Sequence, residues 1–269
     1  MTGSALAAAT ALEDLADDID RYIAHATTHQ PRSLQRRLGP SDLGCPCDRR
    51  LGYHLAGVPP RQQPSKWEAY LGTAFHAQMA RDLATIPWQP RPGVVVPRFL
   101  VEQRLYVGQL GGQDIFGTSD AYDQATNRVI DWKLVGKRSL AHYRRHGAGP
   151  GYSVQGQIYG KGWRLKGYPV DGITIAFMPR SERYGRRHFW HQPFNEQIAD
   201  QALARGNAID AAIKVAGPQA LPHLRTADAQ CLWCPWFDPA SRDVTQGCPG
   251  ELDLPRITPL TPSSTTHGL

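Results

Sequence analysis

The sequence predicts an α/β fold in which helices flank a mixed central sheet. Three observations predict it: apolar residues at helical spacing near both ends of the chain, a central run of strand-like stretches rich in Val, Ile, Phe and Tyr, and a later set of strands that alternates with helical stretches. The 269 residues suit one domain with short appendages.

The chain is expected to begin with an amphipathic helix over residues 4–28. Leu12, Leu15, Ile19 and Ile23 share one face of such a helix, and acidic residues lie between them. Pro31 and the Gly39-Pro40 pair then break the chain. Two further helical stretches are expected at 49–53 and 66–85.

Turn signals divide the centre of the chain into separate strands. The glycine-rich turn at 108–112 and the Asp/Asn turn at 123–127 each follow a strand-like stretch. Glycines at 147–151 predict a flexible break between two helices. In chain order, we expect strands at 94–107, 113–123 and 127–135, helices at 137–146 and 152–166, strands at 170–178 and 187–193, and a helix at 195–215.

Charge is distributed unevenly along the chain. The formal net charge is +6. Residues 133–187 contain 12 Lys or Arg and two acids, so this segment carries 12 − 2 = +10 and the rest of the chain carries −4. Such a block suits a polyanionic partner such as nucleic acid, although a solvated surface would look the same. No apolar run predicts a membrane span and no basic-apolar leader is visible, so an intracellular, cytoplasmic location is expected.

The triplet Asp131-Trp132-Lys133 is the first candidate for chemistry. Side chains alternate along a strand, so Asp131 and Lys133 are expected on one face. If the strand before it forms a hairpin with it, Asp120 comes beside Asp131. Two close carboxylates repel each other unless a cation lies between them, and hard oxygen ligands suit Mg²⁺ or Mn²⁺. Alone, the triplet is equally compatible with a surface salt bridge.

The order of the surrounding residues narrows the choice. His76 ends the helical Gly72-Thr73-Ala74-Phe75-His76 stretch, Glu102 follows on a strand, and Gln155 and Tyr159 come later, four apart on one helix face. With Asp120 and the Asp-Trp-Lys triplet, this series resembles the RecB-like branch of the PD-(D/E)XK nucleases, which includes CRISPR-associated RecB-like, AddB-like and phage exonucleases. The resemblance covers roughly residues 40–250.

The resemblance implies a restriction-endonuclease-like core and a metal-dependent deoxyribonuclease. Such an enzyme would be an exonuclease acting on single-stranded or end-exposed DNA, in a recombination or CRISPR adaptation setting. A non-catalytic DNA-binding or assembly module of the same fold, or a nuclease acting on RNA, stays open. The resemblance implies metal ligands at His76, Asp120, Asp131 and the Trp132 carbonyl, a catalytic lysine at Lys133, and active-site roles for Glu102, Gln155 and Tyr159.

Five cysteines are grouped as an early pair and a late trio. An odd number of cysteines in an intracellular chain argues against a disulfide framework and favours a metal site, for which zinc and a 4Fe-4S cluster both use four thiolates. One subset of the RecB-like family holds an iron-sulfur cluster with one early and three late cysteines. The resemblance therefore implies a clasp between the two ends of the domain, formed by Cys47, Cys231, Cys234 and Cys248, with Cys45 as the alternative to Cys47.

The domain division follows from these expectations: an N-terminal helix at 1–30, a nuclease domain with the clasp at 31–250, and a disordered tail at 251–269 that is rich in Pro, Ser and Thr. Basic residues interleaved with tyrosines suit a single strand of DNA, although the tyrosines could equally be packing residues. The candidate DNA contacts are Lys137, Arg138, Arg144, Arg145 and Tyr152, and Tyr143 and Tyr184 belong to the same interleaved set.

Overall fold

The computed structural model describes residues 3–28, 38–61, 67–227 and 231–250, with side chains from residue 15 onwards. The predicted tail at 251–269 and the break at Pro31 lie outside the described residues. No helix among those described is both long and apolar enough to cross a bilayer. The helices are α1 (Gly3–Thr28), α2 (Pro40–Gly44), α3 (Asp48–Leu55), α4 (Trp67–Ala84), α5 (Lys137–His146), α6 (Gly149–Leu165), α7 (Glu196–Ala216) and the short 3-10 helices Tyr184–Arg186, Gly217–His223 and Cys231–Trp233.

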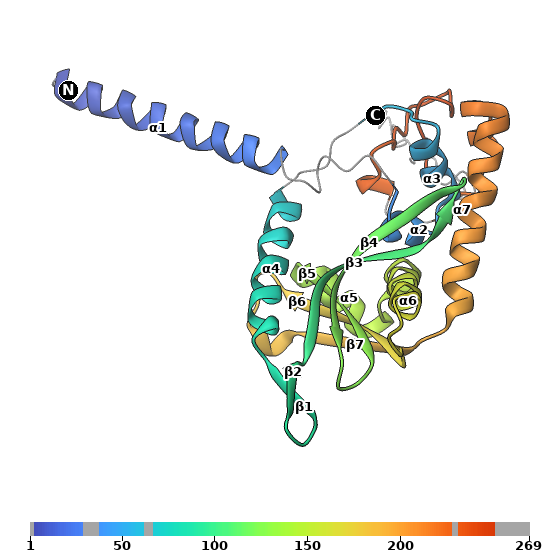
Figure 1. The fold of residues 1–269 in the computed structure, drawn as a ribbon. Helices are drawn as coiled ribbons and strands as arrows, with labels where there is room; N and C mark the ends of the chain where they lie inside the picture. The colour runs from blue at the N-terminus through green and yellow to red at the C-terminus, as the bar shows by residue number, and fades with distance from the viewer. Residues whose placement is uncertain (1–2, 29–37, 62–66, 228–230, 251–269) are drawn as a thin grey trace, which may run out of the picture.

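A mixed five-stranded sheet with the order β3-β4-β5-β6-β7 forms the centre of the fold (Figure 1). Only β5 and β6 are parallel, because α5 and α6 connect them by a crossover. The predicted mixed sheet flanked by helices is therefore confirmed. Its strands are β3 (Phe99–Leu110), β4 (Gln113–Asp123), β5 (Arg128–Val135), β6 (Gly172–Pro179) and β7 (His188–Pro193), and a separate two-stranded sheet contains β1 (Pro87–Arg91) and β2 (Val94–Pro97).

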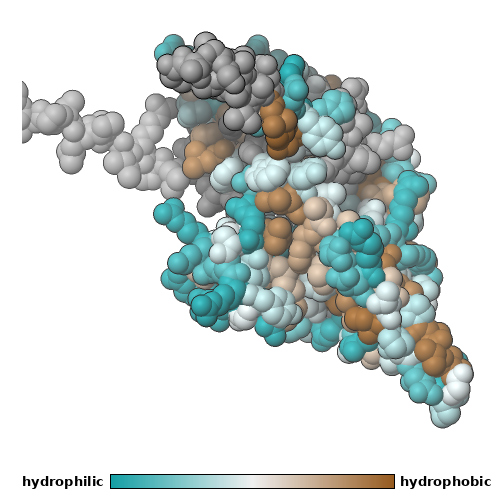
Figure 2. All heavy atoms as spheres, turned by 90° about the vertical axis from the view of Figure 1, so that its left-hand side faces the viewer, coloured by the Kyte–Doolittle hydropathy of each residue, from teal (hydrophilic) through white to brown (hydrophobic). Residues whose placement is uncertain are grey.

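Helices cover both faces of the sheet, as Figure 1 shows for α4 on one side and α6 and α7 on the other. On one face, Trp163 of α6 is fully buried beside Tyr122 and Ile173 in the larger core. On the other face, α4 packs against Trp132 and Met178. The functional consequence is that β4 and β5 lie between α4 and α6, so both helices can contribute side chains at the same end of these strands. On the outer side that carries α4, hydrophilic residues surround separate hydrophobic patches (Figure 2).

Two sequence predictions about element boundaries were wrong, and one strand was not predicted. The strand expected at 94–107 is two strands in two sheets, because the chain turns at Pro97-Arg98 and β2 pairs with the unpredicted β1. β1 contains two prolines, which a two-stranded ribbon tolerates because its outer edges need no hydrogen-bond donors. The break expected at 147–151 is shorter, because α6 begins at Gly149 with Pro150 in its first turn, where the fixed φ of proline suits a helix.

The N-terminal helix is longer than most and stands apart from the core in Figure 1. Its predicted apolar face is largely open to solvent, since Leu15 is 53% and Ile19 is 49% exposed. The helix itself matches the sequence prediction, but the apolar stripe that predicted it does not serve the core of the domain.

Candidate active site

Asp131 and Lys133 lie on the same face of β5, as the alternation of side chains predicts. The Lys133 ammonium lies 2.7 Å from Asp131 Oδ2. Asp131 is only 2% exposed, so its carboxylate is almost fully removed from water. The two residues therefore form a close ion pair at the bottom of a cavity of about 600 Å³, which we call the carboxylate pocket.

Asp120 reaches the same pocket from β4. The antiparallel pairing of β4 with β5 covers Ala121–Asp123 and does not continue to Asp120. Instead, Asp120 Oδ2 accepts a hydrogen bond of 2.8 Å from the Trp132 backbone N–H. The two strands diverge at this point, and the carboxylate of Asp120 occupies the position where a backbone partner would otherwise lie.

His76 and Glu102 complete a group of possible metal ligands around Asp120. His76 on α4 lies with Nδ1 3.2 Å from Asp120 Oδ1. One ligand atom from each of His76, Glu102 and Asp120 lies within 4.8 Å of the other two, and this is the one such group of three or more found among the described residues. Glu102 adopts a φ of 48°, an unfavourable conformation for a residue with a side chain. The backbone of β3 is therefore distorted where it approaches the pocket.

Gln155 and Tyr159 line the pocket from α6, one helical turn apart. Gln155 donates through Nε2 to Asp131 Oδ1 at 3.2 Å, and its Oε1 accepts from Lys133 Nζ at 3.2 Å. A glutamine amide can do both at once because it carries a donor and an acceptor on one planar group. Gln155 thus fixes the Asp131–Lys133 pair, and the ring of Tyr152 supports the Lys133 ammonium at 4.7 Å.

Burial and neighbouring charges shift the pKa values of Asp131 and His76 in this pocket. Burial is the largest effect on Asp131 and raises its pKa; the nearby carboxylate of Asp120 adds to this, while Lys133 opposes it. Burial lowers the pKa of His76, but the hydrogen bond and negative charge of Asp120 outweigh it and leave that pKa raised. Asp131 Oδ2 is buried against the Lys133 ammonium at 2.7 Å, so the negative charge of this carboxylate is offset by one amine.

This donor set fits a hard divalent cation. Carboxylate oxygens are the ligands that Mg²⁺ and Mn²⁺ prefer, whereas the imidazole of His76 is more typical of softer transition metals. A cation would relieve both the desolvation of Asp131 and its repulsion from Asp120. The structure thus brings together His76, Glu102, Asp120, Asp131, Lys133, Gln155 and Tyr159, all seven side chains that the sequence assigned to the site. The roles assigned to them, and that of the Trp132 carbonyl, stay predictions.

Four of the five cysteines meet in a second place, which we call the cysteine pocket. Cys47, Cys231, Cys234 and Cys248 line it, although 200 residues separate the first from the last. Cys45 lines two neighbouring cavities instead. Arg49 is buried beside this pocket, donates to the Leu221 carbonyl at 3.1 Å and lies 3.9 Å from the Cys248 sulfur. Of the two early cysteines, Cys47, which the sequence favoured, therefore lies with the three late ones, and Cys45 lies outside this pocket.

The basic residues of the 133–187 segment do not share one environment. Arg138 and Tyr152 line a groove next to the carboxylate pocket, whereas Arg144 donates to the Arg186 carbonyl at 3.2 Å. Lys161 pairs with Asp200 and Glu196 on α7. Tyr143 is buried, stacks on Phe177 and also lines this groove, so its packing role is observed and its stacking on a base stays a prediction. Lys137, Arg144 and Arg145 are exposed but are not among the residues that line the groove.

Several residues of the site could not be identified from the sequence. Ser41 and Thr73 line the carboxylate pocket, and Arg50 lines both the cysteine pocket and the groove that contains Arg138. The only signal for Ser41 is the Gly39-Pro40 helix start that precedes it, and Thr73 lies in the stretch that ends at His76. Such residues become visible only when the chain is folded, because they come from three distant segments.

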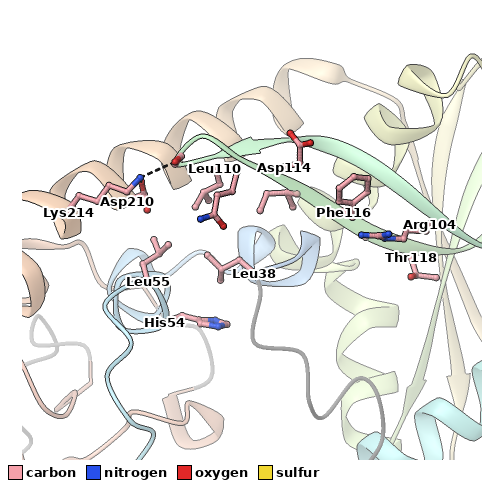
Figure 3. Close-up of a pocket in the computed structure, with 14 residues that line it drawn as sticks. Leu38, His54, Leu55, Arg104, Leu110, Asp114, Phe116, Thr118, Asp210 and Lys214 are labelled. Atoms are coloured by element: carbon pink, nitrogen blue, oxygen red, sulfur yellow. Dashed lines mark hydrogen bonds and ion pairs between the residues drawn. The ribbon is translucent and has the colours of Figure 1, made fainter.

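A further cavity of about 760 Å³, the hairpin groove, lies along β4 beside the carboxylate pocket. Figure 3 shows Arg104 next to the ring of Phe116, where the guanidinium is 4.2 Å from the ring centre. Lys214, which also lines this groove, forms an ion pair with Asp210 at 2.8 Å and donates a hydrogen bond to the Gly111 carbonyl. The two cavities share the stretch Phe116–Thr118.

Comparisons with known proteins give distant structural similarities. The crystal structure of SSO0001 is similar over 81% of this chain and 94% of its own, with 17% identity and a TM-score of 0.47. An alkaline exonuclease, LHK-Exo from Laribacter hongkongensis, is similar over 67% of this chain and 89% of its own, with 10% identity and a TM-score of 0.44. Its complex with dAMP gives 65%, 91%, 10% and 0.39. No protein-family model and no curated protein sequence matches the chain.

Proposed function

We propose that this protein is a metal-dependent nuclease that hydrolyses phosphodiester bonds in single-stranded or end-exposed DNA. The observation that carries the proposal is the convergence of Asp120, Asp131, His76 and Lys133 in one pocket, where Asp131 is 2% exposed. An ion pair kept only for stability would not need a second acid and a histidine around it. Buried charges of this kind are typical of sites where a cation and a phosphate bind.

A Mg²⁺ or Mn²⁺ ion held by His76, Glu102 and Asp120, with Asp131 in the same pocket, would supply an activated water and would offset charge on the phosphate. Lys133 places a second positive charge beside the same carboxylate, where it can stabilise the negative charge that develops on the phosphate oxygens. Gln155 holds Lys133 in place through its side-chain oxygen. Lys133 and Gln155 are therefore in position before a substrate arrives, since their contacts with Asp131 and with each other hold them there.

The test is to incubate labelled single- and double-stranded DNA and RNA with Mn²⁺, with and without chelator, using the parent and Lys133→Ala. We expect metal-dependent DNA cleavage by the parent and a loss of about 10²-fold or more in Lys133→Ala, which removes charge stabilisation from the transition state. Lys161→Ala is the matched control, because Lys161 pairs with acids on α7 outside the pocket. Equal activity in the parent and Lys133→Ala would refute the assignment. Metal-independent binding without cleavage would favour the non-catalytic module. Cleavage of RNA alone would change the proposed substrate from DNA to RNA.

We also propose that Cys47, Cys231, Cys234 and Cys248 hold a 4Fe-4S cluster, with zinc as the alternative. Their common pocket supports the choice of Cys47 over Cys45. Four thiolates can hold either a 4Fe-4S cluster or a tetrahedral zinc ion. Either group would tie the N-terminal part of the domain to its C-terminal part.

Metal analysis of protein purified without oxygen tests this second proposal. We expect a brown protein that contains iron and sulfide and absorbs broadly near about 400 nm. Cys47→Ser should lose the colour and the iron, whereas Cys45→Ser should keep both. Colourless protein with stoichiometric zinc would overturn the cluster and would leave the nuclease proposal unchanged. Loss of iron in Cys45→Ser with retention in Cys47→Ser would show that Cys45, and not Cys47, is the fourth ligand.

A further inference from the structure

A groove runs from the carboxylate pocket across the start of α6. It has a volume of about 720 Å³ and shares Ser41 and Gln155 with the carboxylate pocket, so the two are joined. One wall comes from α5 and the first turn of α6, and the other comes from the segment between α2 and α3. We call it the α5–α6 groove. A polymer bound in this groove can extend directly into the carboxylate pocket.

The α5–α6 groove offers positive charge and is lined by no described carboxylate, although Arg50 also lies beside the thiols of the cysteine pocket. Arg50 lines it from α3, and Arg138 and His142 line it from α5. Neither guanidinium has a hydrogen bond or an ion pair to any described residue. The hairpin groove differs, because Asp114 and Asp210 line it and Lys214 is paired. Of the two cavities next to the carboxylate pocket, the α5–α6 groove is therefore the one suited to phosphates.

Arg50 is held on a rigid element. The preceding residue, Arg49, anchors α3 from the inside by donating to the backbone carbonyls of Leu221, Pro222 and Leu224. Arg50 follows on the same helix and lines both the cysteine pocket and the α5–α6 groove. A cation on an anchored helix loses less conformational freedom on binding than one on a loop. This placement suits a residue that fixes the register of a substrate.

The carboxylate pocket and the α5–α6 groove are joined at Ser41 and Gln155, and Asp131 and Asp120 are 2% and 8% exposed at the pocket end. One continuous phosphate backbone can therefore occupy both cavities. We propose that the α5–α6 groove holds the phosphates of a single DNA strand, through Arg50 and Arg138, while the adjoining phosphodiester of that strand lies in the carboxylate pocket. This inference rests on the proposed nuclease function.

Binding of a fluorescent oligothymidylate, measured by anisotropy, tests the inference separately from cleavage. The full-length protein is used in a Lys133→Ala background with Ca²⁺, so that the strand stays intact. Arg50→Gln and Arg138→Gln should each weaken binding and lower the slope of log K against log salt by about 0.7, the value for one phosphate contact on a single strand. The affinity ratio between parent and variant should then shrink by about 2.6-fold from 50 to 200 mM salt, because 4 raised to the power 0.7 is about 2.6.

Two controls separate the groove from general charge. Arg164→Gln removes the same charge from the same basic segment, but at the far end of α6, and should keep the parent slope. Arg50→Lys keeps the charge and should restore most of the slope. Parent-like binding by both groove variants, or a loss of slope in Arg164→Gln equal to theirs, would overturn the inference. Loss of binding in Arg104→Gln alone would move the strand to the hairpin groove and would overturn it as well.

Failure of the inference and failure of the proposed function give different results. If the parent cleaves DNA and both groove variants bind like the parent, the nuclease stands and the groove assignment is wrong. If the parent cleaves nothing and Arg50→Gln and Arg138→Gln still lose the expected slope, the groove binds nucleic acid and the nuclease is wrong. Thermal melting of each variant shows whether a loss of binding reflects loss of the fold.

Discussion

Binding of Mn²⁺ should stabilise the protein, and Asp131→Asn should abolish that stabilisation. The parent has the imidazole of His76 and the carboxylates of Glu102 and Asp120 with ligand atoms within 4.8 Å of one another, and the buried Asp131 lines the same pocket. A ligand that binds only the folded state adds about 2.7 kcal/mol of stability at a concentration 100 times its Kd. For 269 residues, the entropy of unfolding near the midpoint is about 0.56 kcal/mol per kelvin. The expected rise in Tm is the ratio of the two, about 5 °C.

Differential scanning fluorimetry across a Mn²⁺ titration measures this shift without any substrate. Asp123→Asn is the matched control, because Asp123 is a buried acid on the neighbouring strand β4 but pairs with Arg98 through two hydrogen bonds of 2.9 Å. It should lower the Tm of the metal-free protein and keep the Mn²⁺ shift. Asp131→Asn should lose the Mn²⁺-dependent rise in Tm. A parent Tm that does not respond to Mn²⁺, or an equal response in Asp131→Asn, would refute the cation site.

Three further predictions concern positioning, packing and pH. Gln155→Ala should slow single-turnover DNA cleavage by about tenfold or more while keeping the Mn²⁺ shift, because it removes the support of Lys133 and keeps the metal ligands; an unchanged rate would show that Lys133 needs no support. Gly44→Ala should destabilise by about 1–3 kcal/mol in chemical denaturation, since its Cβ would lie 2.5 Å from the Gly151 carbonyl oxygen, whereas Gly72→Ala, with open space around it on α4, should stabilise by up to about 1 kcal/mol. Burial raises the pKa of Asp123, but bonds from Arg98 and Thr126 outweigh it and leave that pKa lowered, so its contribution to stability is complete above about pH 4 and disappears as the pH falls through the folded-state pKa. The stability difference between the parent and Asp123→Asn should therefore shrink below about pH 4, and a difference that grows there would contradict this.

Regular periodicity made much of the fold and part of the site predictable. Asp131 and Lys133 meet because strand side chains alternate, and Gln155 and Tyr159 share a pocket because they are one helical turn apart. The boundary at Pro97 was not predictable, because the Val-rich stretch before it and β3 after it read as one strand. Arg50 and Ser41 were not predictable either, since no local pattern indicates which distant segments will line the same cavity.

The alternation that predicts the strands fails at the positions where the candidate site lies. Glu102 has a left-handed φ within an otherwise extended strand, and it lies between the Val101–Ala121 and Gln103–Ser119 pairs, opposite Asp120. On the other side of β4, the pairing with β5 stops just before Asp120, whose side chain takes the Trp132 N–H. Both irregularities cost conformational or hydrogen-bonding free energy, and both bring carboxylates to one pocket, where Asp120 is buried and Glu102 is exposed. A sheet selected for stability alone would have continued its pairing here, so the distortion supports the proposed cation site.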